Sequence, residues 1–257
     1  MREQTIFNME LGIIYSKRLL LLLLVVLSLT SCEKICDCAK STGEITSEFR
    51  TTGNIQQIEL NNNIDLVIHI DSTPKLKITA GKNLISEITT DNNNGVLNIK
   101  NKNNCNWVRD FNTSIIVEVW TPSLNYLIAN DATGDIYFVD SLDCNGFYFD
   151  SFSSTGQFHF KLKGTEAHLN INTGPADIKA TGDVNNFYLY GAGYGRLDCV
   201  NLHSNYVYVT NKGTNNCYIN AQQLIEASIY GAGNIYYKGS PALIVKKEFG
   251  KGKLISL

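Results

Sequence analysis

A pattern with a period of 20 residues runs through the second half of this chain and limits what it can fold into. Two apolar columns recur at that period: Phe149, Leu169, Leu189, Val209 and Ile229 form one, and Phe147, Ala167, Phe187, Val207 and Ala227 form the other. Polar or amphipathic residues separate the two columns in every repeat. Because side chains alternate between the faces of a strand, each repeat predicts a strand with one buried and one solvated face.

A strand that returns at a fixed spacing predicts a β-solenoid, in which each coil buries its apolar face only by stacking on its neighbours. Apolar pairs from Ile136 and Phe138 to Ile235 and Tyr237 indicate a second strand in each coil. Leucines between Leu142 and Leu243 indicate a shorter third side. We therefore expect an all-β chain, similar to a parallel β-helix, with about 20 residues per coil.

A glycine stands between the first and the second strand of successive coils. These glycines are Gly134, Gly156, Gly174, Gly193, Gly213 and Gly233. Glycine allows a positive φ or a close approach of two backbones without steric cost, so it suits a sharp corner. The repeated "YGAG" at 190–193 and 230–233 is therefore interpreted as a corner. A dinucleotide-binding loop is disfavoured because no helical pattern follows it.

The first half of the chain also alternates, most clearly in "IELNNNIDLVIHI" at 58–70. Further strands are expected at residues 76–80, 85–90, 96–100 and 115–120, separated by turn-rich segments. We expect residues 49–125 to form a β region that caps the solenoid, because an open end would present unpaired backbone. Residues 126–257 are expected to form the coils of the same continuous domain.

The N-terminus has the order of a secretory signal. Lys17 and Arg18 precede an apolar run at 19–29, and "LTSC" ends at Cys32. The run is too short for a stable membrane span. Residues 1–31 thus predict a lipoprotein signal peptide, with Cys32 as the lipidated residue; the alternative is an ordinary cleaved signal with a coincidental cysteine. Glu33 after Cys32 favours the outer membrane, and residues 32–48 are expected to be a tether.

The cysteines apart from Cys32 are expected to be thiols. Cys36 and Cys38 lie in the tether at a spacing that disfavours a bond between them. Cys199 and Cys217 are expected to point inward from adjacent coils with an offset of two residues. That offset places their Cα atoms roughly 8 Å apart, beyond the reach of a disulfide.

Composition and motifs give no support for catalysis. A formal net charge of −2 gives no reason to expect nucleic acid as a partner. The four histidines show no zinc-binding spacing, and no nucleophile motif is present. Asp135, Asp177 and Asp198 follow their corners one per coil, which favours a role in the turns over metal binding. We expect no catalytic residue, no cofactor and no metal site.

One surface feature suggests binding. Tyr148, His168, Tyr188 and Tyr208 are expected to share an outward column, with Tyr190 and Tyr230 two positions along. Such a set of aromatic rings can stack on sugars or anchor a protein partner. The alternative is that the rings only stabilise adjacent layers of the solenoid.

Several segments resemble the head GIN domain family. They include "FRTTGNIQQIELNNNIDLVIHI" at 49–70 and, most specifically, "YGAGNIYYKGSP" within the closing segment at 225–257. The family's usual Gly-Ser-Gly corner is Gly-Ala-Gly here. The resemblance covers residues 49–257 and implies a β-solenoid adhesin of Bacteroidetes-type lipoproteins; the family defines no catalytic residues.

Together these observations predict a non-catalytic lipoprotein of the cell envelope, lipid-anchored at the outer membrane. It would act as an adhesion or ligand-binding module, with a glycan or a host or envelope protein as partner. Two alternatives stay open. One is a carbohydrate-active β-helix enzyme whose loop at 101–112 assembles a carboxylate and a base. The other is a structural or sensory envelope protein with a protein partner.

Overall fold

The computed structural model describes residues 41–103 and 115–257 of the chain. By contacts the chain divides into two compact units, residues 1–41 with 103–110 and residues 42–102 with 111–257. The account below concerns the second unit. The signal peptide, Cys32 and most of the tether and of the loop at 101–112 lie outside the described residues.

Strands dominate the described residues, with one short 3-10 helix, η1 (Ile85–Glu87). Their bounds in chain order are β1 (Ile45–Arg50), β2 (Gln57–Asn61), β3 (Asp65–Ile70), β4 (Lys75–Gly81), β5 (Ile88–Asn93), β6 (Val96–Asn101), β7 (Ile116–Thr121), β8 (Tyr126–Asn130), β9 (Ile136–Phe138), β10 (Leu142–Phe152), β11 (Gln157–Ile171), β12 (Asp177–Gly191), β13 (Leu197–Asn211), β14 (Cys217–Ile229), β15 (Ile235–Lys238), β16 (Leu243–Glu248) and β17 (Leu254–Ser256). No helix among the described residues is long and apolar enough to cross a membrane.

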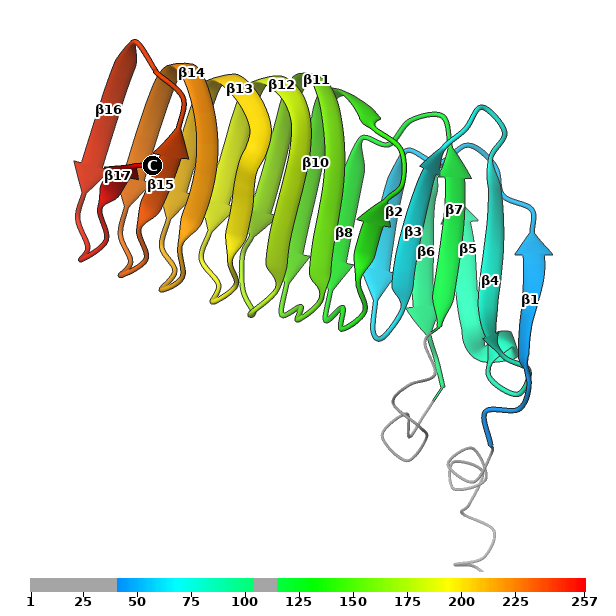
Figure 1. Cartoon of the computed structure of the whole chain (residues 1–257). Coiled ribbons are helices and arrows are strands. Elements are labelled where there is room, and N and C mark those ends of the chain that lie inside the picture. The colour runs from blue at the N-terminus through cyan, green and yellow to red at the C-terminus, as the bar shows by residue number, and fades with distance from the viewer. Residues whose placement is uncertain (1–40, 104–114) are drawn as a thin grey trace, which may run out of the picture. The chain divides into compact units, whose positions relative to one another are not determined.

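From β8 onward the strands stack in parallel, coil on coil, as expected for a β-solenoid (Figure 1). Leu169 lies opposite Leu189, and Leu189 lies opposite Val209, each 20 residues further along the chain. These residues are buried and belong to one apolar core that runs through the coils. The predicted fold class and period are therefore confirmed.

The period changes in the last coils. Val209 pairs with Ala227, 18 residues later, and not with Ile229. Register shifts between β13 and β14 cause the difference, because β14 uses fewer residues than β13 between its second and its first side. The predicted columns are thus wrong by two residues from β14 onward.

The region expected to form a cap contributes a coil of its own. Strand β2 pairs in parallel with both β6 and β8, and β3 pairs in parallel with both β7 and β9. The β2–β3 coil therefore lies between two coils that come later in the chain. Antiparallel pairs, β1 with β4, β4 with β7, and β5 with β6, complete this end of the domain.

Two local expectations need correction. Strand β1 begins at Ile45, within the range expected for the tether, because residues 45–50 pair with β4. The segment expected to be a strand from residue 85 instead starts with η1, and β5 begins only at Ile88. Arg50 at the end of β1 donates to the carbonyl oxygen of Ile88 and to the Thr90 hydroxyl, which links β1 to β5.

The corner glycines are required by close backbone approach. A Cβ at Gly156 would lie 2.0 Å from the carbonyl oxygen of Gly134, and one at Gly193 would lie 2.2 Å from that of Gly174. Among the six predicted corner glycines, only Gly174 has a positive φ. Successive coils therefore touch at this corner through their backbones, which leaves no room for a side chain.

The described cysteines are buried thiols. Cys144, Cys199 and Cys217 form no disulfide. Cys217 lies opposite Leu197, so it is offset by two residues from Cys199, as predicted. Burial raises the pKa of Cys144 and of Cys217 to about 12 and that of Cys199 well above its usual range. These side chains act as small apolar residues of the core.

Candidate binding groove

Four aromatic residues on the outer face of the first sheet form a continuous stack, which we call the ring ladder. The centroids of Tyr148 and His168 are 4.1 Å apart, those of His168 and Tyr188 4.2 Å, and those of Tyr188 and Tyr208 4.7 Å. The parallel register of β10 to β13 places these residues directly opposite one another. The predicted outward column is therefore present at all four positions.

Stacking determines what the ring ladder offers to a ligand. The planes of His168 and Tyr188 differ by 2°, so each ring covers a face of the next. Ring faces in the middle of the ladder are occupied by neighbours, and their edges and hydroxyl groups are left for contact from outside. Burial, with a smaller effect of the Glu166 charge, raises the pKa of Tyr188, so its hydroxyl stays protonated at neutral pH.

A second outward column runs beside the ring ladder, two positions along each strand. Asp150, Asn170, Tyr190 and Thr210 lie opposite one another in successive coils, as predicted. The next residue in this column is Ser228, and not Tyr230. The shorter spacing of β14 moves Tyr230 beyond the end of the strand.

Tyr230 belongs instead to a cluster at the glycine corner. Its ring stacks on Phe249 with centroids 4.8 Å apart. The Lys212 ammonium lies 5.4 Å from the centroid of Tyr190 and 5.5 Å from that of Tyr230. Lys212 thus connects Tyr230 to the second column through two cation–π contacts.

A groove of about 320 Å³ lies between the two columns. Its lining includes His168, Asn170, Tyr188, Tyr190, Tyr208, Thr210, Glu226 and Ser228. The structure therefore brings together four of the six predicted surface residues. Tyr148 continues the ladder beyond the groove, and Tyr230 lies at the corner. Glu226 and Ser228 were missed by the sequence reasoning, because the strict period of 20 residues assigned Ser228 to the other column.

The two ends of the groove differ in their hydrogen bonds. Toward β10, His168 bonds Glu166 at 3.0 Å, and the Asn170 amide donates to Asp150 at 3.2 Å. Toward β14, the side chains of Tyr208, Thr210, Glu226 and Ser228 have no hydrogen-bond partner among the described residues. Polar groups available to a ligand are therefore concentrated at the β14 end, which we call the open end of the groove.

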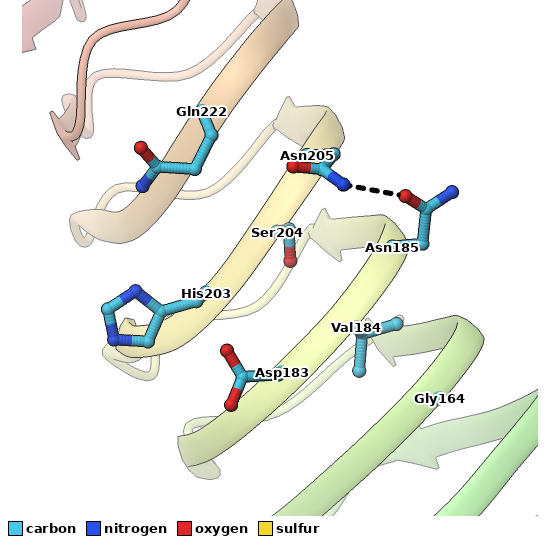
Figure 2. A pocket seen from close by; sticks show the side chains of 8 residues that line it. All are labelled: Gly164, Asp183, Val184, Asn185, His203, Ser204, Asn205 and Gln222. Atoms are coloured by element: carbon cyan, nitrogen blue, oxygen red, sulfur yellow. Dashed lines mark hydrogen bonds between the residues drawn. The ribbon is translucent and has the colours of Figure 1, made fainter.

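A second, more polar cavity of about 360 Å³ lies near the bulges of β12 and β13 (Figure 2). Asp183 lies opposite His203 across the two strands, and Asn205 donates to Asn185 at 2.8 Å. Gln222 on β14 completes one side of the lining. The sequence reasoning did not identify this cavity, although Thr165, Asn185 and Asn205 recur at a period of 20 residues. Stacked polar residues at a bulge are sufficient to explain that recurrence.

The aspartates that follow the corners bind backbone of the neighbouring coil. Asp135 accepts from the backbone N–H of Gln157 at 2.8 Å, and Asp177 accepts from that of Arg196 at 2.6 Å. Asp198 pairs instead with the Arg196 guanidinium at 3.0 Å. In residues 41–103 and 115–257 no group of three or more His, Cys, Asp or Glu is placed to hold a metal ion. The predicted role in the turns is thus confirmed for Asp135 and Asp177.

His69 on β3 is not simply solvated, as its alternation suggested. Its ring stacks on Trp120 with centroids 4.5 Å apart, and its Nε2 lies 3.5 Å from Glu118. Lys75 covers the Trp120 ring at 4.6 Å. This cluster on the outer face of the N-terminal strands has both faces of its indole covered, so it offers no free ring to a ligand.

A family model described as "Putative auto-transporter adhesin, head GIN domain" matches residues 54–241, which include the β2–β3 coil and both columns of the groove. The chain belongs to the head GIN domain family. This match confirms the family that the N-terminal and closing segments predicted. No protein with a curated description is significantly similar to this head GIN chain.

Solved structures share the fold of this head GIN chain. A "putative adhesin" from Bacteroides fragilis superposes with a TM-score of 0.75 at 20% identity, over 83% of this chain and 97% of its own. A "Putative lipid binding protein" from Parabacteroides distasonis gives 0.66 at 18% identity, over 84% and 98%. A "putative adhesin" from Parabacteroides merdae gives 0.59 at 20% identity, over 85% and 98%.

Proposed function

We propose that this head GIN chain is a non-catalytic adhesion or ligand-binding module of the cell envelope. It is anchored to the outer membrane through a lipid on Cys32 and uses no cofactor. The family description supports adhesion, and the order of positive, apolar and small residues before Cys32 supports the anchor. Two or more acyl chains on one residue are enough to hold a protein on a bilayer.

The observation that carries the proposal is the groove between the two outward columns. Tyrosine edges line it along three coils, and its open end has a carboxylate and hydroxyl groups without internal hydrogen bonds. Tyrosine combines a large apolar area with one polar group and low conformational freedom, which makes it a frequent anchor at binding surfaces. A glycan or a protein of the host or envelope fits this surface, whereas the small net negative charge disfavours nucleic acid.

A binding screen tests the proposal. The full chain, purified in mild detergent, is applied to a glycan array and to extracellular-matrix proteins, and released products are monitored in the same wells. We expect saturable binding without product, and we expect Tyr190→Ala to weaken it. Tyr218→Ala is the matched control, because Tyr218 stacks on Tyr236 in another sheet, outside the groove. Product release would overturn the non-catalytic proposal, and equal loss in both variants would exclude the groove.

The anchor is tested separately. Cells that express the chain are grown with a clickable fatty acid, and the membrane fraction is probed for labelled protein. We expect label on the wild-type chain and none on Cys32→Ser, which would move to the soluble fraction. Equal labelling of the two chains would exclude Cys32 as the lipidated residue.

A further inference from the structure

The ring ladder ends abruptly at Tyr208. Its ring stacks on Tyr188 on one side, with the two planes only 10° apart. On the other side the register places Glu226 in the position that a ring occupies in each of the preceding coils. No ring contacts that second face among the described residues, and Glu226 is exposed. The ladder thus has one uncovered ring face, at the open end of the groove.

Groups that suit a ring with hydroxyl substituents surround this face. Glu226 provides a carboxylate acceptor, while Thr210 and Ser228 provide hydroxyl groups that donate and accept. None of the three side chains has a hydrogen-bond partner among the described residues. A cationic ligand is less suitable, because Lys247 follows Ser228 in the same outward column one coil later. Like charges in adjacent positions are unfavourable.

We propose that the uncovered face of Tyr208 binds a pyranose ring, which takes the place of the next ring of the ladder. Glu226, Ser228 and Thr210 hydrogen-bond the hydroxyl groups of this sugar. The spacing of about 4.8 Å between parallel strands leaves room for one ring per coil. This proposal deepens the proposed function and rests on it, because it names the ligand class and the exact position in the groove.

Glu226→Tyr gives a direct test. The substitution extends the ring ladder by one residue and fills the position assigned to the sugar. The probes are cellobiose, chitobiose, lactose and mannobiose, measured by saturation-transfer NMR with the full chain in detergent. We expect Glu226→Tyr to abolish binding of the disaccharide that the wild-type chain binds, without lowering the melting temperature. Tyr208→Ala should weaken binding about tenfold, because it removes the stacking face.

Control variants keep the test independent of folding and of the broader proposal. Tyr218→Ala, in another sheet, should bind as the wild-type chain does. Unchanged binding in Glu226→Tyr would overturn the sugar position, while loss in Tyr190→Ala in the same assay would leave the groove as the binding surface. Binding of a trilysine peptide, with none of the disaccharides bound, would also overturn the proposal in favour of a cationic ligand.

Discussion

The ring of Tyr188 lies face to face with the ring of Tyr208, with centroids 4.7 Å apart and planes at 10°. Because Tyr188 also stacks on His168, it contributes to two contacts between coils, whereas Tyr208 contributes to one. The same residues therefore stabilise the solenoid and line the groove. Loss of binding in a ladder variant is informative only when its stability is measured alongside.

Tyr188→Ala is expected to lower the free energy of unfolding by about 1 to 3 kcal/mol, since an aromatic pair contributes about 0.5 to 1.5 kcal/mol beyond area burial. Tyr208→Ala removes one pair and should cost about half as much. Urea unfolding followed by circular dichroism measures both. Equal losses in the two variants would show that stacking between coils is not what the rings contribute.

The corner gives a sharper prediction. A Cβ at Gly193 would lie 2.2 Å from the carbonyl oxygen of Gly174 and 2.8 Å from Ile171, so the coils would have to separate. We expect Gly193→Ala to cost about 3 kcal/mol or more, or to prevent folding. Gly53→Ala is the matched control, because its Cβ would meet only Asn92, at 3.9 Å. A small, equal effect at the two glycines would contradict the close approach seen at the corner.

The core of each coil could be predicted because its signal is local and repeated. Phe149, Leu169, Leu189 and Val209 share one column in the sequence and in the structure. Each pair of adjacent coils reports the same alternation, so a single period is enough to align them. The corner glycines follow from the same alignment.

Other parts of the fold leave no such signal. The β2–β3 coil lies between coils formed by later strands, and pairing between segments remote in the sequence has no local pattern. The misplacement of Tyr230 has a different cause, since β14 closes its coil in fewer residues than β13. The open end of the groove was missed for that reason. Its residues Glu226 and Ser228 are identified only once the register of β14 is known.

Asp65 is expected to make stability depend on pH. Its carboxylate accepts from the backbone N–H of Asp135 at 2.9 Å, as Asn216 and Asn234 accept from backbone at other coils. Burial is the main cause that raises the pKa of Asp65, and the Asp135 charge adds to it. The folded chain therefore holds this proton more tightly than the unfolded chain, so stability decreases as pH rises from the unfolded pKa through the folded one.

Asp65→Asn should keep the backbone hydrogen bond and remove the charge. We expect its melting temperature to exceed that of the wild-type chain by about 1 to 2 °C at pH 7, the shift for about 0.5 kcal/mol in a domain of this size. At pH 3, where Asp65 is protonated in both states, the difference should vanish. Asp177→Asn is the control, because the residue that binds it in the next coil is Arg196. A wild-type chain that is more stable than Asp65→Asn at pH 7 would contradict the raised pKa.

The last coil closes the apolar core with charges. Ile225, Ala227 and Ile229 are buried, and the residues opposite them in β16 are Ile244, Lys246 and Glu248. Glu248 accepts from Lys246 at 3.2 Å, from Lys253 at 3.0 Å and from the backbone N–H of Leu254 at 3.1 Å. The Leu254 hydrogen bond is the main cause that lowers the pKa of Glu248 to about 2. Inward charges on a terminal strand oppose pairing with another chain.

The double variant Lys246→Ala, Glu248→Ile restores the apolar pattern of the preceding coil at this end. We expect it to associate end to end, because the final strand would then present unpaired backbone beside an apolar surface, as in strands that aggregate. Sedimentation velocity at increasing protein concentration would reveal dimers or larger species. Lys247→Ala, which alters an outward residue of the same strand, should sediment as the wild-type chain does. If the double variant also sediments unchanged, Lys246 and Glu248 do not protect this end. In the wild-type chain the Glu248 contacts stabilise fully above the unfolded pKa and weaken only as pH falls toward about 2, so mild acid should not produce the same association.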